Sequence, residues 1–261
     1  MVRKLISLIL STLVILLASL TPLDTKEYGL KRVVIDAGHG GKDPGTHGEI
    51  SREKDVALDI ALELGEIIKE YLPDVEVIYT RKDDNFVELD NRARIANKNG
   101  ADLFISIHCN WISNSKVKGT ESWVMGVHKS ESNLQVAKRE NSSILLEEDY
   151  EERYEGFDPN SPESHILFSL FQSAHLDNSL NLASKIEQQF EKRVGRRSRG
   201  VKQAGFIVLY KTAMPSVLVE VGFLSNPTEE KELNDDLKQT YIASGIFRAF
   251  RDYKYELEGK N

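Results

Sequence analysis

The sequence predicts an α/β fold: a single domain with a twisted, mostly parallel central sheet, helices on both faces, and an inserted, partly helical segment. Two observations support this prediction. Short apolar runs typical of buried strands alternate with longer segments whose apolar residues recur at helical spacing. One stretch, from about residue 129 to 177, interrupts this alternation with polar and acidic residues. Strands connected through helices run parallel, and a parallel sheet is covered on both faces.

The strands are expected at apolar or alternating runs. The first begins at Val33 and leads into a Gly-His-Gly-Gly turn at Gly38, where glycine allows the backbone to turn sharply. The others are expected at residues 75–79, 103–107, 120–126, 206–209 and 217–221.

Helices are expected between these strands. Ser51 can cap a helix that continues to Tyr71. A helix over residues 89–99 should end with Gly100 just after its last turn. Pro227 suits the first position of a short helix after Asn226. Two further amphipathic helices are expected over residues 180–194 and 241–250.

Composition excludes several classes of protein. The length of 261 residues allows one large domain or two small ones. A net charge of −7 argues against nucleic acid as the main partner. Cys109 is the only cysteine, so the chain can form neither an intramolecular disulfide nor a CxxC zinc site, and we expect the thiol to be buried.

The N-terminus differs in kind from the rest. Residues 1–22 place Arg3 and Lys4 before an apolar run to Ala18, which is typical of a secretory signal peptide. The alternative is an uncleaved membrane anchor, because the cleavage site is not a clean A-x-A. No cysteine follows, which excludes a lipoprotein anchor. We expect an exported protein of the periplasm or cell envelope, without a stable membrane anchor after cleavage, whose folded domain spans residues 28–258.

Three polar residues lie where strands end or a helix begins. His39 follows the first strand, His108 ends the third, and Glu53 lies in the first turn of a helix. The carboxyl ends of parallel strands meet at one edge of the sheet, so the two histidines can lie side by side. Two imidazoles and a carboxylate are a ligand set of catalytic zinc sites, in which the fourth position is left to water.

Glu220 adds a fourth candidate. It lies inside the apolar run from Val217 to Val221, where a carboxylate needs a partner. A structural salt bridge is one explanation. The other is a general acid/base that takes a proton from the metal-activated water and passes it to a leaving amine.

Four motifs in order resemble the zinc-dependent N-acetylmuramoyl-L-alanine amidases. They cover residues 33–48, 51–54, 101–110 and 215–227. The resemblance implies one zinc ion per chain, bound by His39, Glu53 and His108, with Glu220 as the catalytic acid/base. It also implies peptidoglycan as the substrate, cleaved between the lactyl group of N-acetylmuramic acid and L-alanine. Cys109 stands where the family usually has alanine.

Two other functions remain open at this point. One is a zinc peptidase acting on stem peptides, which product analysis would distinguish from an amidase. The other is a catalytically inactive peptidoglycan-binding module. Retention of all four candidate residues argues against the inactive module.

The insertion at residues 129–177 has two interpretations. It is either a solvated acidic loop followed by a core helix, or a plug over the zinc. The plug resembles division-associated amidases, in which an inserted helix blocks the site until an activator with a LytM-like domain removes it. We expect a monomer whose zinc is blocked by one glutamate of this segment, with the apolar residues 166–171 seating the plug or binding the activator. The candidates are Glu147, Glu148, Glu151, Glu152, Glu155 and Glu163.

The remaining polar residues are expected to have ordinary roles. Arg94 is expected to be a charged partner within the fold, with a substrate role as the alternative. The basic run at residues 196–199 should be a solvated turn, or else a contact for anionic glycan strands. Surface or packing roles are expected for His47, His128, His165 and His175.

Overall fold

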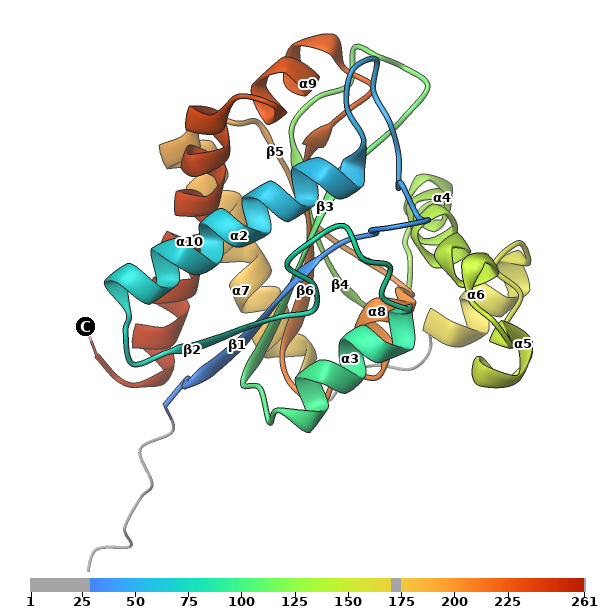
Figure 1. The fold of residues 1–261 in the computed structure, drawn as a ribbon, viewed down its shortest axis with the longest axis horizontal. Helices are drawn as coiled ribbons and strands as arrows, with labels where there is room; N and C mark the ends of the chain where they lie inside the picture. The colour runs from blue at the N-terminus through green and yellow to red at the C-terminus, as the bar shows by residue number, and fades with distance from the viewer. Residues whose placement is uncertain (1–28, 170–174, 261) are drawn as a thin grey trace, which may run out of the picture.

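The computed structural model describes residues 29–169 and 175–260, and contains a six-stranded sheet in the order β2-β1-β3-β6-β4-β5. All neighbouring strands are parallel except β4 and β6, which are antiparallel. The predicted, mostly parallel α/β sheet is therefore confirmed (Figure 1). The strands are β1 (Arg32–Ala37), β2 (Glu76–Tyr79), β3 (Leu103–Asn110), β4 (Thr120–Met125), β5 (Ser198–Ala204) and β6 (Ser216–Phe223).

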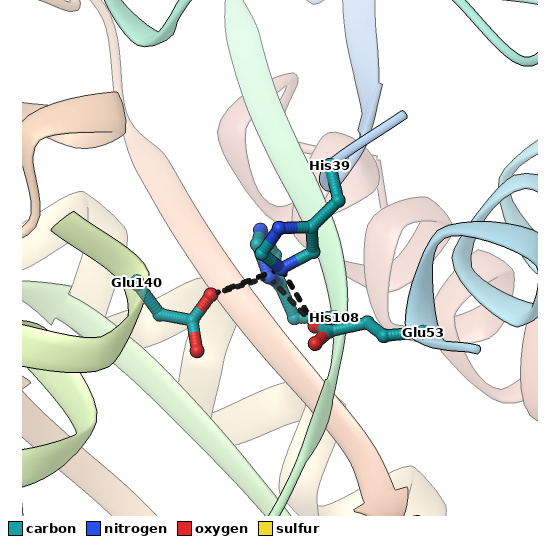
Figure 2. A group of neighbouring side chains, drawn as sticks. All are labelled: His39, Glu53, His108 and Glu140. Atoms are coloured by element: carbon teal, nitrogen blue, oxygen red, sulfur yellow. Dashed lines mark hydrogen bonds and ion pairs between the residues drawn. The ribbon is translucent and has the colours of Figure 1, made fainter. Parts of the chain in front are cut away.

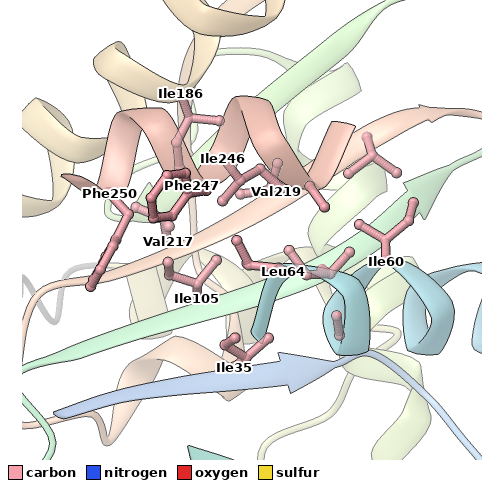
Figure 3. Close-up of a cluster of buried hydrophobic side chains, with 14 of the residues drawn as sticks. Ile35, Ile60, Leu64, Ile105, Ile186, Val217, Val219, Ile246, Phe247 and Phe250 are labelled. Carbon is pink, nitrogen blue, oxygen red and sulfur yellow. The ribbon is translucent and has the colours of Figure 1, made fainter. Parts of the chain in front are cut away.

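Helices cover both faces of this sheet. The first face carries α2 (Glu53–Tyr71), α7 (Leu176–Gln189) and α10 (Asp236–Leu257), whose apolar residues enclose Ile35, Ile105 and Val219 (Figure 3). The second face carries α3 (Leu89–Lys98) and α8 (Ile207–Tyr210). The chain also forms η2 (Phe190–Val194) and α9 (Pro227–Leu233).

Strand alternation decides which side chains reach the second face. Successive side chains of a strand point to opposite faces. Ile105 and Ile107 belong to the first core cluster, whereas Phe104 belongs to the second. His108 therefore projects from the second face, and Glu220, its register partner on β6, projects beside it.

The insertion packs on this second face. It comprises α4 (Glu131–Asn141), η1 (Ser142–Leu146), α5 (Tyr150–Arg153) and α6 (Pro162–Ser169), which project to one side of the sheet in Figure 1. Ala137, Ile144 and Phe157 bury their side chains in the second core cluster. The segment is thus a folded part of the domain rather than a solvated loop.

Two local predictions were wrong, and one strand was not predicted. Residues 206–209, predicted as a strand, instead contribute most of the short helix α8, because periodicity cannot distinguish strand from helix in a short, wholly buried apolar run. The strand lies earlier, at β5, an edge strand whose single neighbour explains its polar sequence. The cap of α2 is Arg52, while the Ser51 hydroxyl donates a hydrogen bond to Glu230.

The predicted C-terminal end of α3 and the predicted start of α9 are confirmed. Gly100 has a φ of 58° just after α3, and the side chain of Asn226 accepts hydrogen bonds from the first turn of α9. The predicted signal peptide lies outside the described residues. Within residues 29–169 and 175–260, none of the helices has the length and apolar character needed to span a membrane.

Candidate metal centre

Four buried side chains converge at the carboxyl end of β1 and β3. His39 follows β1, His108 is on β3, Glu53 begins α2, and Glu140 comes from α4 of the insertion. Figure 2 shows Glu140 approaching the histidines from the side opposite Glu53. One ligand atom from each residue lies within 4.8 Å of all the others.

The spacing of these atoms fits a tetrahedral metal ion. His39 Nε2 lies 3.1 Å from Glu53 Oε1 and 3.2 Å from Glu140 Oε2. His108 Nδ1 lies 3.0 Å from the same two oxygens. Zinc bonds of about 2.0–2.1 Å place tetrahedral ligands roughly 3.3 Å apart. The four nitrogen–oxygen distances are therefore close to those around a shared zinc ion.

The hydrogen bonding of His39 also fits a cation. Its Nδ1 lies 2.8 Å from Asp43 Oδ2, so a neutral ring that donates there presents an unprotonated Nε2 to the cluster. That Nε2 and Glu140 Oε2 are both buried without a hydrogen-bond partner. A lone pair facing two carboxylates is stable only if a positive charge lies between them.

Glu53 is fixed before any metal arrives. Its Oε2 accepts a hydrogen bond from Thr46 N (2.8 Å), and its Oε1 accepts one from Cys109 N (2.9 Å). The loop before α2 and strand β3 therefore aim this carboxylate at the histidines. Cys109 is buried as expected, and burial raises the pKa of its thiol.

The histidine pKa values show the same need for positive charge. Burial opposes protonation of both rings, but the surrounding carboxylates outweigh it. The pKa of His39 rises well above its usual value through Glu53 and Asp43. Glu140 and Glu53 raise the pKa of His108 to about 9. Without a metal ion, protons on these rings compensate the buried carboxylates.

Two consecutive residues of α4, Arg139 and Glu140, contact Glu220 and the two histidines, respectively. Arg139 Nε donates to Glu140 Oε1 at 2.9 Å, and its Nη2 lies 3.5 Å from Glu220 Oε1. Burial opposes ionisation of Glu140, yet Arg139 and His108 hold its pKa well below the usual range. Glu140 thus presents an anionic oxygen to the two histidines.

Glu220 is fully buried beside His108. Its Oε2 has no hydrogen-bond partner. Burial and then repulsion from Glu140 raise its pKa well above the usual value, which favours the protonated form. Arg139 therefore approaches only one oxygen of Glu220, and the other oxygen lies unpaired beside His108.

The prediction of which glutamate of the insertion lies at the metal centre was wrong. Glu140 lies there, and none of the six predicted glutamates does. Glu147 is buried elsewhere: Oε1 accepts from Leu89 N at 2.8 Å and Oε2 accepts from Tyr154 Oη at 2.8 Å. It caps the start of α3 instead of approaching the histidines. The other predicted glutamates are solvent-exposed, namely Glu148, Glu151, Glu152, Glu155 and Glu163.

A sequence signal for Glu140 existed. Leu134, Ala137 and Ile144 recur at helical spacing and are buried, so they define the inner face of the helical segment that carries Glu140. The density of acidic residues after Glu147 drew the prediction away from this helix. Asp43, the partner of His39, lies inside the first motif but has no distinguishing pattern of its own.

Other residues have the roles that their positions allow. Arg94 pairs with Asp90 on the same helix, and His165 packs against Phe157. The prediction that residues 196–199 form a solvated turn was wrong. Arg196 is buried against Glu229, and Arg199 lies within β5 and pairs with Glu121. The five residues outside this run that were expected to have ordinary roles, all in the described part of the chain, are not members of the metal cluster.

Comparison with known proteins gives the family of this fold and site. Residues 33–252 match the family described as N-acetylmuramoyl-L-alanine amidase. The chain belongs to this family. The amidase AmiA of Escherichia coli K12 is 34% identical over 235 residues, which cover 89% of this chain and 79% of AmiA.

Solved amidase structures have the same fold. The catalytic domain of CwlV from Bacillus (Paenibacillus) polymyxa superposes with a TM-score of 0.61 at 31% identity, covering 85% of this chain and 97% of that domain. The CwlD amidase of Clostridioides difficile, solved in complex with the GerS lipoprotein, superposes with a TM-score of 0.63 at 27% identity, covering 85% of this chain and 98% of that one. This amidase therefore hydrolyses the bond between N-acetylmuramic acid and L-alanine in peptidoglycan.

Proposed function

We propose that this amidase is a zinc enzyme that is held inactive by its own insertion. The observation that carries the proposal is the cluster of His39, Glu53, His108 and Glu140, whose ligand atoms all lie within 4.8 Å of one another. His39, Glu53 and His108 would hold zinc, one ion per chain. When bound, zinc lowers the pKa of a water molecule and polarises the substrate carbonyl.

Glu220 is the catalytic acid/base in this proposal. It is the register neighbour of His108 and projects from the same face of the sheet. When the insertion moves away, the repulsion from Glu140 that favours the protonated form of Glu220 is removed, and the ionised carboxylate can take a proton from the attacking water and then donate it to the departing L-alanine nitrogen. Asp43 orients His39 by accepting a hydrogen bond from Nδ1, and Glu53 is fixed by two backbone donors.

The insertion keeps both functions unavailable. Glu140 takes the fourth ligand position, and Arg139 lies against Glu220. Ser143 also reaches the site, where its hydroxyl donates to Asp43 at 2.7 Å. Activity therefore requires α4 and η1 to move away from the histidines. The adjoining hollow of about 530 Å³, lined by His47, Trp111 and Leu146 among others, is where substrate would enter.

Release of the insertion calls for a partner. Ile166 and Leu167 on α6 are exposed, at 47% and 65%, and offer apolar contacts to an activator, for which a LytM-like domain is our candidate. The predicted apolar stretch continues to residue 171, of which residues 170 and 171 lie outside the described part of the chain. The structure of CwlD with a lipoprotein shows that an amidase of this fold can bind a protein partner.

We further propose export to the periplasm or cell envelope as a monomer, with a role in wall remodelling or daughter-cell separation. Residues 1–22 would be the signal peptide, and residues 28–258 the catalytic domain. The proposal is tested by measuring metal content and the masses of products from digested peptidoglycan. Release of intact stem peptides by a protein with one zinc ion supports it. Cleavage within stem peptides would indicate a peptidase, and absence of zinc would contradict the metal assignment.

A further inference from the structure

Two buried arginines surround the backbone that presents His39. Arg81 Nε donates to the carbonyl of Ala37 at 2.9 Å, and its Nη2 donates to Gly38 O at 2.7 Å. Arg92 donates to Ala37 O and to His39 O, each at 2.7 Å. Three successive carbonyls, beginning with that of the last residue of β1, are thus held by the guanidinium groups of two arginines that are 4% and 1% exposed.

This backbone needs support, because His39 adopts a left-handed conformation with a φ of 59°. Such a conformation costs on the order of 1–3 kcal/mol for a residue other than glycine, and it persists only when surrounding contacts impose it. A guanidinium group presents several donors in a rigid plane, which lysine cannot reproduce. Arg81 and Arg92 supply those contacts.

The same arginines reach the elements that carry the other two ligands. Arg81 Nη2 also donates to Lys54 O at 2.7 Å, one residue after Glu53 in the first turn of α2. Arg92 Nη1 lies 2.8 Å from Asp36 Oδ1. Asp36 Oδ2 accepts a hydrogen bond of 2.6 Å from Ser106 Oγ, two residues before His108 on β3.

We propose that Arg81, Arg92 and Asp36 form a positioning hub that sets the geometry of all three metal ligands before the metal binds. The two arginines bond the backbone around His39, Arg81 also bonds the backbone just after Glu53, and Asp36 bonds a side chain near His108 on β3. None of these three hub residues belongs to the metal cluster itself. Ligands must be held within roughly 0.5 Å of their productive geometry, which loops alone rarely achieve. This inference rests on the proposed zinc site.

The test is zinc affinity, measured by competition with a chromophoric chelator on the mature full chain. Arg92→Lys keeps the charge but cannot hold Ala37, His39 and Asp36 together. We expect about 10- to 100-fold weaker zinc binding, as for other partners of metal ligands, with kcat lowered and KM little changed. Ser106→Ala removes only one hydroxyl, and we expect roughly fivefold weaker binding from the loss of one hydrogen bond.

A matched control separates positioning from general stability. Lys254 is 1% exposed and donates to Leu30 O at 2.9 Å, before β1 and therefore at the opposite end of that strand from His39. Lys254→Met should lower the thermal midpoint of the metal-free protein and leave zinc affinity unchanged.

Wild-type zinc affinity in folded Arg92→Lys and Ser106→Ala would overturn the proposed hub. If Arg92→Lys does not fold, Ser106→Ala decides alone. Equal weakening by Lys254→Met would also overturn it, because the effect would then be one of overall stability. Failure of the wild-type chain to bind zinc is a different result, and it would contradict the proposed function instead.

Discussion

Replacing Glu140 by alanine should turn on the resting amidase without an activator. The substitution removes the carboxylate that faces His39 and His108 and would be the fourth ligand of the metal. It also removes the carboxylate that accepts a hydrogen bond from Arg139 Nε at 2.9 Å. Breaking a buried ion pair by removing one member costs about 3–5 kcal/mol. Since about 1.4 kcal/mol corresponds to a tenfold change in an equilibrium, the lower value shifts the closed–open equilibrium about 100-fold.

Basal hydrolysis should rise by a similar factor while the open form remains the minor one. The assay is dye release from labelled, purified peptidoglycan by the zinc-loaded mature protein. Glu131→Ala is the matched control, because Glu131 lies on the same helix, is exposed and is not part of the metal cluster. Three protein ligands remain, so zinc should stay bound. A folded, zinc-loaded Glu140→Ala variant with wild-type basal hydrolysis would refute the reasoning.

Three further outcomes are expected. Glu220→Gln should retain zinc but lose activity by about a hundredfold to ten-thousandfold, because an amide cannot move the proton; near-normal turnover would assign Glu220 a structural role. Glu147→Gln places an amide against Leu89 N or Tyr154 Oη, so weakened seating of the insertion should raise basal hydrolysis up to about tenfold, and an unchanged rate would place its anchor elsewhere. Zinc affinity should rise with pH up to about 9, where His108 loses its proton, and a flat profile in chelator competition would contradict the raised pKa.

The pH dependence of metal-free stability follows from the same group. The folded-state pKa of His108, about 9, lies above its ordinary value of 6.5. Its contribution to the free energy of unfolding is therefore complete below the ordinary value and is lost as pH rises toward 9. Bound zinc replaces the proton, so the zinc-loaded protein should not show this loss.

Much of the fold could be predicted because burial leaves clear patterns. The runs of β1, β3 and β6 are largely apolar on both faces, as central parallel strands require, and His108 and Glu220 are among the few polar residues that interrupt them. The edge strand β5 was missed because one free edge permits a polar sequence. The helix α8 was misassigned because its few residues are buried on all sides.

The site was predictable only to the extent that local sequence determines it. His39, Glu53 and His108 lie at strand and helix ends, which the pattern indicates. Glu140 reaches them through the packing of α4 on the sheet; the apolar spacing of this helix indicates its inner face but not which ligands that face meets. The supporting arginines are also long-range, because Arg81 and Arg92 contact backbone more than 40 residues earlier in the chain.

Anomalous diffraction at the zinc edge, from crystals of the zinc-loaded mature protein, tests the central claim most directly. We predict one peak within bonding distance of His39 Nε2, His108 Nδ1 and the carboxylates of Glu53 and Glu140, with protein atoms in all four positions. A peak elsewhere would contradict the metal assignment. A water molecule in place of Glu140 would contradict the proposal that the insertion holds the resting enzyme inactive.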